Sequence, residues 1–115
     1  MIPAKYNFPD QYKGDTFDGI QFTLRINGSS LSYVDLTGAS IKCSFKGPRG
    51  PVIKTITNGD GINIINASGG KFEIEPFILD WEQNVYNYDI QITFPSGEIK
   101  TYIKGYVNIV IDTTK

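Results

Sequence analysis

The sequence predicts an all-β fold: a single antiparallel β-sandwich of immunoglobulin-like size, with about seven or eight strands. Three observations favour this fold. Apolar and polar residues alternate with a period of two over most of the 115 residues. Turn sequences rich in Gly, Asn and Pro recur about every eight to twelve residues, and no repeated helical pattern lies between them. A single closed barrel is the alternative architecture.

The first predicted strand covers residues 20–26, where Ile20, Phe22, Leu24 and Ile26 alternate with polar residues. A period of two places these side chains on one face of a strand, whereas a helix would scatter them around its axis. The turn sequences NGSS, GPRGP, NGDG and ASGG separate this strand from those that follow. Further strands are predicted at residues 41–45, 52–57, 62–65 and 71–75.

Two features interrupt the alternation after residue 75. Pro76 has no N–H to donate to a neighbouring strand, so the preceding strand should stop there or lie at an edge. Residues 77–84, FILDWEQN, are the one place where a short helical turn is expected, with Asp80 as its cap. Such a short segment cannot form an independent helix, so it would be a packed corner.

The clearest element is a β-hairpin over residues 86–112. Its first strand directs alternate residues from Tyr86 to Phe94 inward, and the PSG turn supplies a fixed proline and a left-handed glycine. Gly105, in the middle of the return strand, predicts a bend or bulge. The inward face of the return strand is predicted to carry Ile99, Ile103, Val107, Ile109 and Ile111. The opposite face is predicted to carry Lys100, Tyr102, Lys104, Tyr106 and Asn108.

The inward residues of these strands are predicted to form one core, because a register slip of one residue would expose a whole face. Cys43 is the only cysteine and alternates with Ile41 and Phe45, which predicts a buried apolar side chain rather than a reactive thiol. The predicted core consists of Ile20, Phe22, Leu24, Ile41, Phe45, Phe72, Ile74, Tyr88, Ile90, Ile92 and Ile109.

The charge balance and the residue types argue against several function classes. Eleven basic and twelve acidic residues give a net charge of −1, which provides no overall attraction for nucleic acid or an anionic membrane. The lack of histidine excludes Ser-His-Asp, Cys-His and His-based metal chemistry. Glu73 and Glu75 are interpreted as solvated carboxylates, and NGDG at 58–61 as a β-turn rather than a calcium loop. We therefore expect no catalytic, cofactor-binding or metal-binding site, and no enzymatic activity.

Residues 1–14 are predicted to form an extended N-terminal arm, and residues 15–115 the immunoglobulin-like domain. The prolines of the arm disfavour a helix or a central strand, but Tyr6, Phe8 and Tyr12 are too apolar for a solvated tail. The arm lacks the charged-then-apolar run of a signal peptide. No stretch of the chain approaches the ~20 apolar residues of a membrane span.

Two interpretations of the arm are open. It can fold back along the edge of its own sandwich, or its aromatic residues can dock on a neighbouring subunit. In the docking interpretation, deleting residues 1–12 should leave the melting temperature of the isolated domain nearly unchanged. Tyrosine suits such contacts because it combines a large rigid ring with a hydroxyl. The predicted partner-binding residues are Tyr6, Phe8, Tyr12, Tyr102 and Tyr106.

Trp81, Tyr102 and Tyr106 are also candidates for a sugar-stacking platform. For Trp81 the alternative is core packing at a corner of the sandwich. For the two tyrosines the alternatives are a face covered by neighbouring lysine side chains, or a partner surface. A carbohydrate- or cell-surface-binding module is therefore the alternative function, because a fold alone does not determine function.

Several short motifs occur in a distinctive order along the chain. They are GDTF at 14–17, DLTGASIK at 35–42, GGKF at 69–72, YDIQ at 88–91, and Gly97 followed by KTY at 100–102. In this order they resemble the small β-sandwich domain found at the N-terminus of upper-baseplate proteins in tailed phages, and in related short virion proteins. The resemblance covers residues 14–112.

The resemblance implies a structural virion component, assembled in the cytoplasm of the bacterial host, that docks onto other phage proteins or copies of itself and is not an enzyme. In the baseplate proteins a linker and a receptor-binding or fibre-holding region follow this domain, whereas here the sequence stops at DTTK. The implied roles are a capsid decoration protein, a tail or baseplate adaptor, or an anchor for a separate fibre. This class predicts assembly without a soluble ligand, whereas a carbohydrate-binding module predicts a monomer that binds glycans.

Overall fold

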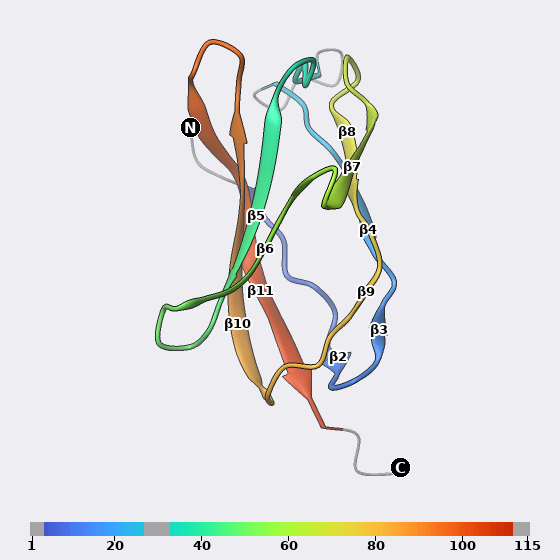
Figure 1. Cartoon of the computed structure of the whole chain (residues 1–115), viewed down its shortest axis with the longest axis vertical. Coiled ribbons are helices and arrows are strands. Elements are labelled where there is room, and N and C mark those ends of the chain that lie inside the picture. The colour runs from blue at the N-terminus through green and yellow to red at the C-terminus, as the bar shows by residue number, and fades with distance from the viewer. Residues whose placement is uncertain (1–3, 27–32, 112–115) are drawn as a thin grey trace.

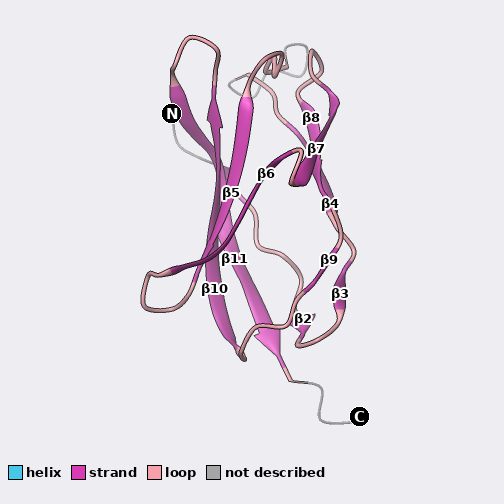
Figure 2. Cartoon of the chain, in the orientation of Figure 1, coloured by secondary structure: helices cyan, strands magenta, loops and turns pink. Residues whose placement is uncertain are grey.

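All regular structure in the described part of the protein is β-strand. A computed structural model describes residues 4–26 and 33–111, and Figure 2 shows strands joined by loops, with no helix among these residues. The predicted all-β class is therefore confirmed. The strands are β1 (Ala4–Lys5), β2 (Gln11–Tyr12), β3 (Thr16–Phe17), β4 (Ile20–Thr23), β5 (Ser40–Lys46), β6 (Val52–Asn58), β7 (Gly61–Asn66), β8 (Lys71–Ile74), β9 (Phe77–Ile78), β10 (Asn84–Thr93) and β11 (Ile99–Val110).

One mixed sheet contains all of these strands except β3 and β9, which form a second, small sheet. Its order is β1-β11-β10-β5-β6-β7-β8-β4, and β2 also pairs with β11. β1 and β2 run parallel to β11, and β6 runs parallel to β7, whereas the other pairs are antiparallel. The prediction of a fully antiparallel arrangement is therefore wrong. Each longer strand was predicted from the sequence, but the two-residue strands β1, β2, β3 and β9 are too short to show an alternation.

The mixed sheet curls so that its two ends approach each other. Figure 1 shows β5, β10 and β11 on one side of the molecule and β4, β7 and β8 on the other. The chain passes from one side to the other at the connection between β6 and β7, which pair over two positions. Where the ends of the sheet approach, the ring centroids of Tyr6 and Phe22 are 5.7 Å apart. The core lies between the two sides.

The residues predicted to form the core lie in or against one cluster of buried side chains. Ile20 and Phe22 are half-buried at the edge of this cluster, and the other nine are buried. The prediction of a shared core is confirmed. Cys43 is fully buried, as predicted; its burial, and secondarily the charge of Asp89, raise the pKa of the thiol well above its ordinary value.

A β-bulge in β11 changes which residues face the core. Two consecutive residues of β10 pair with Ile103 and Thr101, so Tyr102 is the extra residue of the bulge. Tyr102 is consequently buried, although strict alternation placed it on the outer face. Ile99 is 59% exposed and Ile111, which follows the end of β11, is 52% exposed. Both were predicted to face inward, and both predictions are wrong because the bulge shifts the phase and the sheet ends before residue 111.

The corner at residues 77–84 contains a short strand where a helical turn was predicted. Its first two residues form β9, which pairs with β3. The N–H of Leu79 donates a hydrogen bond to the carbonyl oxygen of Asp15 at 3.0 Å. A helical turn here would break the pairing of β9 with β3. The contact with β3 therefore determines that this segment is a strand. β8 ends at Ile74, before Pro76, as predicted.

The hairpin turn between β10 and β11 agrees with the sequence prediction. Gly97 has a φ of 92°, in the left-handed region that favours glycine. The N–H of Phe94 donates to the carbonyl oxygen of Glu98 at 2.9 Å, and the N–H of Gly97 donates to that of Phe94 at 2.8 Å. The turn predicted at residues 27–30 lies outside the described residues.

Candidate functional site

The predicted arm lies along the edge of its own sheet. Residues 4–13, which we call the N-terminal segment, pair with β11 through β1 at one end and β2 at the other. Between these strands, the N–H groups of Tyr6 and Phe8 donate to the carbonyl oxygens of Lys104 and Tyr106 at 2.9 and 3.0 Å. The segment therefore forms the edge of the sheet next to β11, as in the first interpretation of the arm.

Phe8 anchors the N-terminal segment in the core. Its side chain is 4% exposed, and its ring stacks on that of Tyr88 with centroids 4.6 Å apart and planes 14° apart. The rings of Phe17 and Phe45 lie 5.4 and 6.4 Å away. This placement corrects the expectation that Phe8 is available to a neighbouring subunit, because its own chain covers the ring.

Gly105 allows the N-terminal segment to approach β11 closely. A Cβ atom at this position would overlap the carbonyl oxygen of Tyr6 and lie 2.9 Å from the side-chain oxygen of Asn7. The hydroxyl of Tyr88 donates to the same Tyr6 oxygen at 2.5 Å, and burial raises the pKa of this hydroxyl. A bend or bulge was predicted at Gly105, and no bulge occurs there, since Gly105 pairs in register with Tyr88. Close approach of another backbone segment explains the glycine instead.

The substitution Gly105→Ala should loosen the N-terminal segment. Overpacking of this kind typically costs about 1–3 kcal/mol. Hydrogen exchange at the amides of Tyr6 and Phe8 should therefore accelerate about tenfold or more, as measured by native-state exchange with NMR detection. Gly47→Ala is the control, because the nearest atom to its added methyl group would be 3.7 Å away. Equal exchange rates in the two variants would contradict the described contact.

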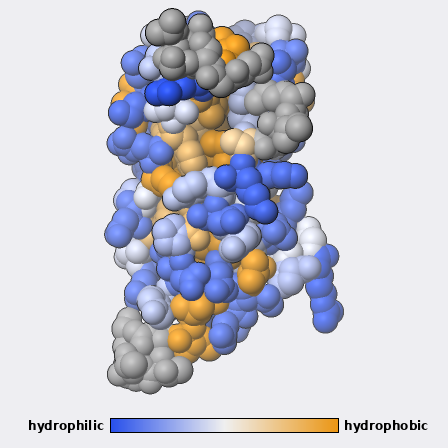
Figure 3. All heavy atoms as spheres, turned by 180° about the vertical axis from the view of Figure 1, so that it is seen from behind, coloured by the Kyte–Doolittle hydropathy of each residue, from blue (hydrophilic) through white to orange (hydrophobic). Residues whose placement is uncertain are grey.

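Two tyrosines lie on the outer face of β11 and β2, the face turned away from the core. Tyr106 and Tyr12 are 39% and 46% exposed. Tyr12 pairs with Val110, and Val85 of β10 pairs with Asn108. Val85, 44% exposed, is therefore the diagonal neighbour of both Tyr106 and Val110. We call Tyr12, Val85, Tyr106 and Val110 the apolar patch. Figure 3, which shows the molecule from behind, has hydrophobic residues exposed at its lower end.

The other predicted docking residues lie in different places. Tyr6 is 37% exposed and lies where the two ends of the curled sheet approach each other. Tyr102 is 9% exposed, and its ring meets that of Phe94 edge-on with centroids 6.3 Å apart. The predicted residues are thus divided among the outer face (Tyr12 and Tyr106), the approach of the sheet ends (Tyr6) and the interior (Phe8 and Tyr102).

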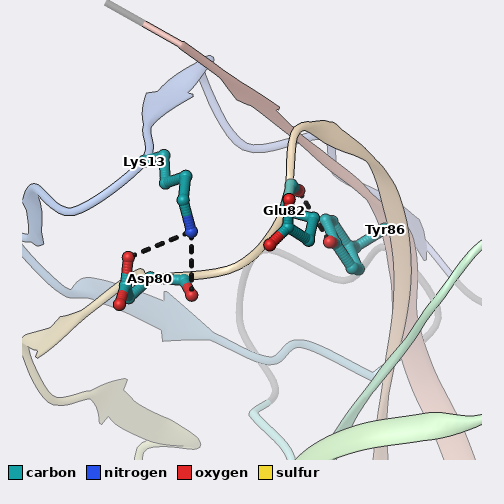
Figure 4. Close-up of polar contacts among 4 residues, drawn as sticks. All are labelled: Lys13, Asp80, Glu82 and Tyr86. Carbon is teal, nitrogen blue, oxygen red and sulfur yellow. Dashed lines mark hydrogen bonds and ion pairs between the residues drawn. The ribbon is translucent and has the colours of Figure 1, made fainter.

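Polar contacts hold the corner after β9 against the N-terminal segment (Figure 4). Lys13 Nζ forms an ion pair with Asp80 Oδ1 at 3.1 Å. The hydroxyl of Tyr86 donates to the carbonyl oxygen of Glu82 at 2.6 Å. Burial, followed by the charge of Glu82, raises the pKa of Tyr86. The Lys13–Asp80 ion pair connects the end of the N-terminal segment to the corner, and the Tyr86–Glu82 hydrogen bond connects the corner to β10.

Trp81 packs inside this corner and not on the face that carries Tyr106. Its ring centroid lies 5.2 Å from that of Phe45 and 5.1 Å from that of Tyr86. Trp81 is half-buried against the core, which confirms the packing alternative for this residue. Because Tyr102 is buried as well, Trp81, Tyr102 and Tyr106 do not form the sugar-stacking platform considered from the sequence.

Acidic side chains are dispersed over the part of the chain that the structure describes. Among residues 4–26 and 33–111, no three His, Cys, Asp or Glu side chains lie close enough together to hold a metal ion. Glu73 accepts a hydrogen bond from Asn63 Nδ2 at 3.3 Å on the surface of the sheet. Within the same described ranges, no helix is long and apolar enough to cross a membrane.

Comparison with known proteins gives no family assignment. No protein-family model matches the sequence, and no curated protein is similar to it.

Proposed function

We propose that the protein is a non-enzymatic structural component of a bacteriophage virion that docks onto other virion proteins or onto copies of itself. The apolar patch supports the docking part of the proposal, because it places two tyrosines and two valines on one sheet face, three of them exposed, and the order of the sequence motifs supports the virion part. Aromatic rings of this kind are enriched in protein interfaces, and grouped exposed apolar side chains mark interaction sites. We also propose that the fold is an immunoglobulin-like sandwich, as in the phage domain that the sequence motifs resemble.

The apolar patch is held on paired strands. β11 is hydrogen-bonded to β10 on one side and to the N-terminal segment on the other. A backbone held in this way has little conformational freedom left to lose when a partner binds. This arrangement suits a lasting subunit contact, as in a baseplate or tail adaptor, a fibre anchor or a capsid decoration protein.

The direct test of this function is the composition of purified virions. Particles of the phage or prophage that encodes the chain should contain it when gradient-purified virions are analysed by mass spectrometry. Portal, tail or capsid genes should lie beside its gene. Absence of the chain from purified particles would contradict the proposal. A monomer that binds glycans on an array and is absent from particles would support the carbohydrate-binding alternative instead.

The substitution Tyr106→Ala should reduce incorporation into particles without unfolding the protein. Loss of an interface hot spot costs about 2 kcal/mol or more in binding, which is about a thirtyfold decrease in affinity. The measurement is the amount of variant in particles assembled without the native protein. Tyr33→Ala is the matched control, because Tyr33 is 38% exposed and lies outside the apolar patch. Equal incorporation of both variants would rule out the patch as the docking surface.

A further inference from the structure

The outer face next to the apolar patch carries a row of charged side chains that crosses three strands. Lys5 of β1 pairs with Lys104 of β11, and Lys104 pairs with Asp89 of β10. Residues paired in neighbouring strands point to the same face of the sheet. The structure therefore places two ammonium groups and one carboxylate side by side on the outer face.

A third ammonium group joins this row from β5. Asn87 pairs with both Lys46 and Tyr106, and Lys46 Nζ lies 3.8 Å from Asp89 Oδ2. These side chains surround a hollow of about 300 Å³ in the outer face. Its lining includes Lys5, Lys46, Asp89, Thr101, Lys104 and Tyr106.

The charges around the hollow are unbalanced. Asp89 forms an ion pair with Lys46, whereas neither Lys5 nor Lys104 has a carboxylate within 4.0 Å among the described residues. Like charges placed directly opposite each other on neighbouring strands are destabilising. A bound anion would relieve this repulsion and make charge-assisted hydrogen bonds to both ammonium groups.

We propose that this hollow binds carboxylate side chains of an acidic segment of a partner protein. The inference rests on the proposed function and adds the chemistry of the partner. Tyr106 belongs both to the hollow and to the apolar patch, so one partner segment can place a carboxylate in the hollow and an apolar side chain on the patch. A protein is favoured over nucleic acid because the chain has a net charge of −1 and the adjoining patch is apolar.

The test uses a hexaglutamate peptide with blocked ends as the probe and a hexaglutamine peptide as its control. Amide signals of Lys5, Asn87, Asp89, Thr101 and Lys104 should shift with hexaglutamate in a saturable manner at low salt, and less at physiological salt. Hexaglutamine should leave them in place. Absence of shifts at these amides, or equal shifts with both peptides, would overturn the proposal.

Two variants locate the site. Lys104→Gln should weaken hexaglutamate binding about fivefold, the equivalent of about 1 kcal/mol for one partly exposed ion pair. Lys71→Gln, in β8 on the opposite side of the molecule, should bind the peptide like the native protein. If both variants weaken binding equally, the peptide is attracted by general charge and the proposed site is wrong.

A hexathymidine oligonucleotide distinguishes carboxylate from phosphate. If it shifts the same amides at lower concentration than hexaglutamate, the hollow binds phosphate groups and the proposal fails. The virion test is independent of this result. A chain found in particles that does not bind hexaglutamate would overturn only the chemistry of the partner, whereas a chain that binds the peptide and is absent from particles would overturn the virion function.

Discussion

Replacing Phe8 with alanine should lower the free energy of unfolding by about 3–5 kcal/mol. The ring is 4% exposed and stacks on Tyr88 at 4.6 Å, so the substitution removes apolar burial and leaves a cavity between the two sides of the sheet. Urea denaturation followed by circular dichroism measures the change.

Deleting residues 1–12 should also lower the melting temperature of the protein. This expectation is the opposite of the one derived from the sequence for a docking arm.

Tyr12→Ala is the control for Phe8→Ala, because it removes an aromatic ring from the same segment at a side chain that is 46% exposed. We expect a loss of less than about 1 kcal/mol for this variant, as for most surface substitutions. If Phe8→Ala is no more destabilising than Tyr12→Ala, the N-terminal segment does not belong to the core in solution.

Replacing Ile90 with alanine should lower the free energy of unfolding by about 2–5 kcal/mol. Ile90 is fully buried in β10, between Cys43 of β5 and Ile103 of β11. Ile99→Ala is the matched control on the same hairpin, and it should cost less than about 0.5 kcal/mol because Ile99 is 59% exposed. Comparing Ile90→Ala with Ile99→Ala also tests the bulge, since strict alternation would place both isoleucines in the core. Similar losses in the two variants would contradict the described phase of β11.

The sequence was sufficient to predict the longer strands and most of the core. From Tyr86 to the end of β10, apolar and polar residues alternate without interruption, and Tyr88, Ile90 and Ile92 are buried as expected. In β11, the alternation alone could not reveal that Tyr102 is an extra residue, because a bulge depends on pairing with β10 and not on residue type. Gly105 indicated an unusual position in the strand, but the reason for the glycine is the close approach of Tyr6, about a hundred residues earlier in the chain.

Only part of the candidate site could be predicted from the sequence, because the exposure of a side chain depends on how the sheet curls. Tyr12 and Tyr106 lie on the outer face, but Phe8 and Tyr102 are equally aromatic and are buried. The alternation that identifies a strand says which side chains share a face, but it does not say which face another segment covers. The cluster of lysines was not found because it combines residues from β1, β5 and β11, whose neighbourhood is known only from the topology.

The pairing of the N-terminal segment with β11 also determines when folding can finish. Ala4 pairs with Ile103 and Tyr12 with Val110, so the residues of this contact leave the ribosome about a hundred positions apart. Contacts between such distant positions form slowly. Until they form, the growing chain has Phe8 unburied and one edge of the twelve-residue strand β11 open to other nascent chains. Correct folding and aggregation therefore compete for the same edge of β11 once this strand has been synthesised.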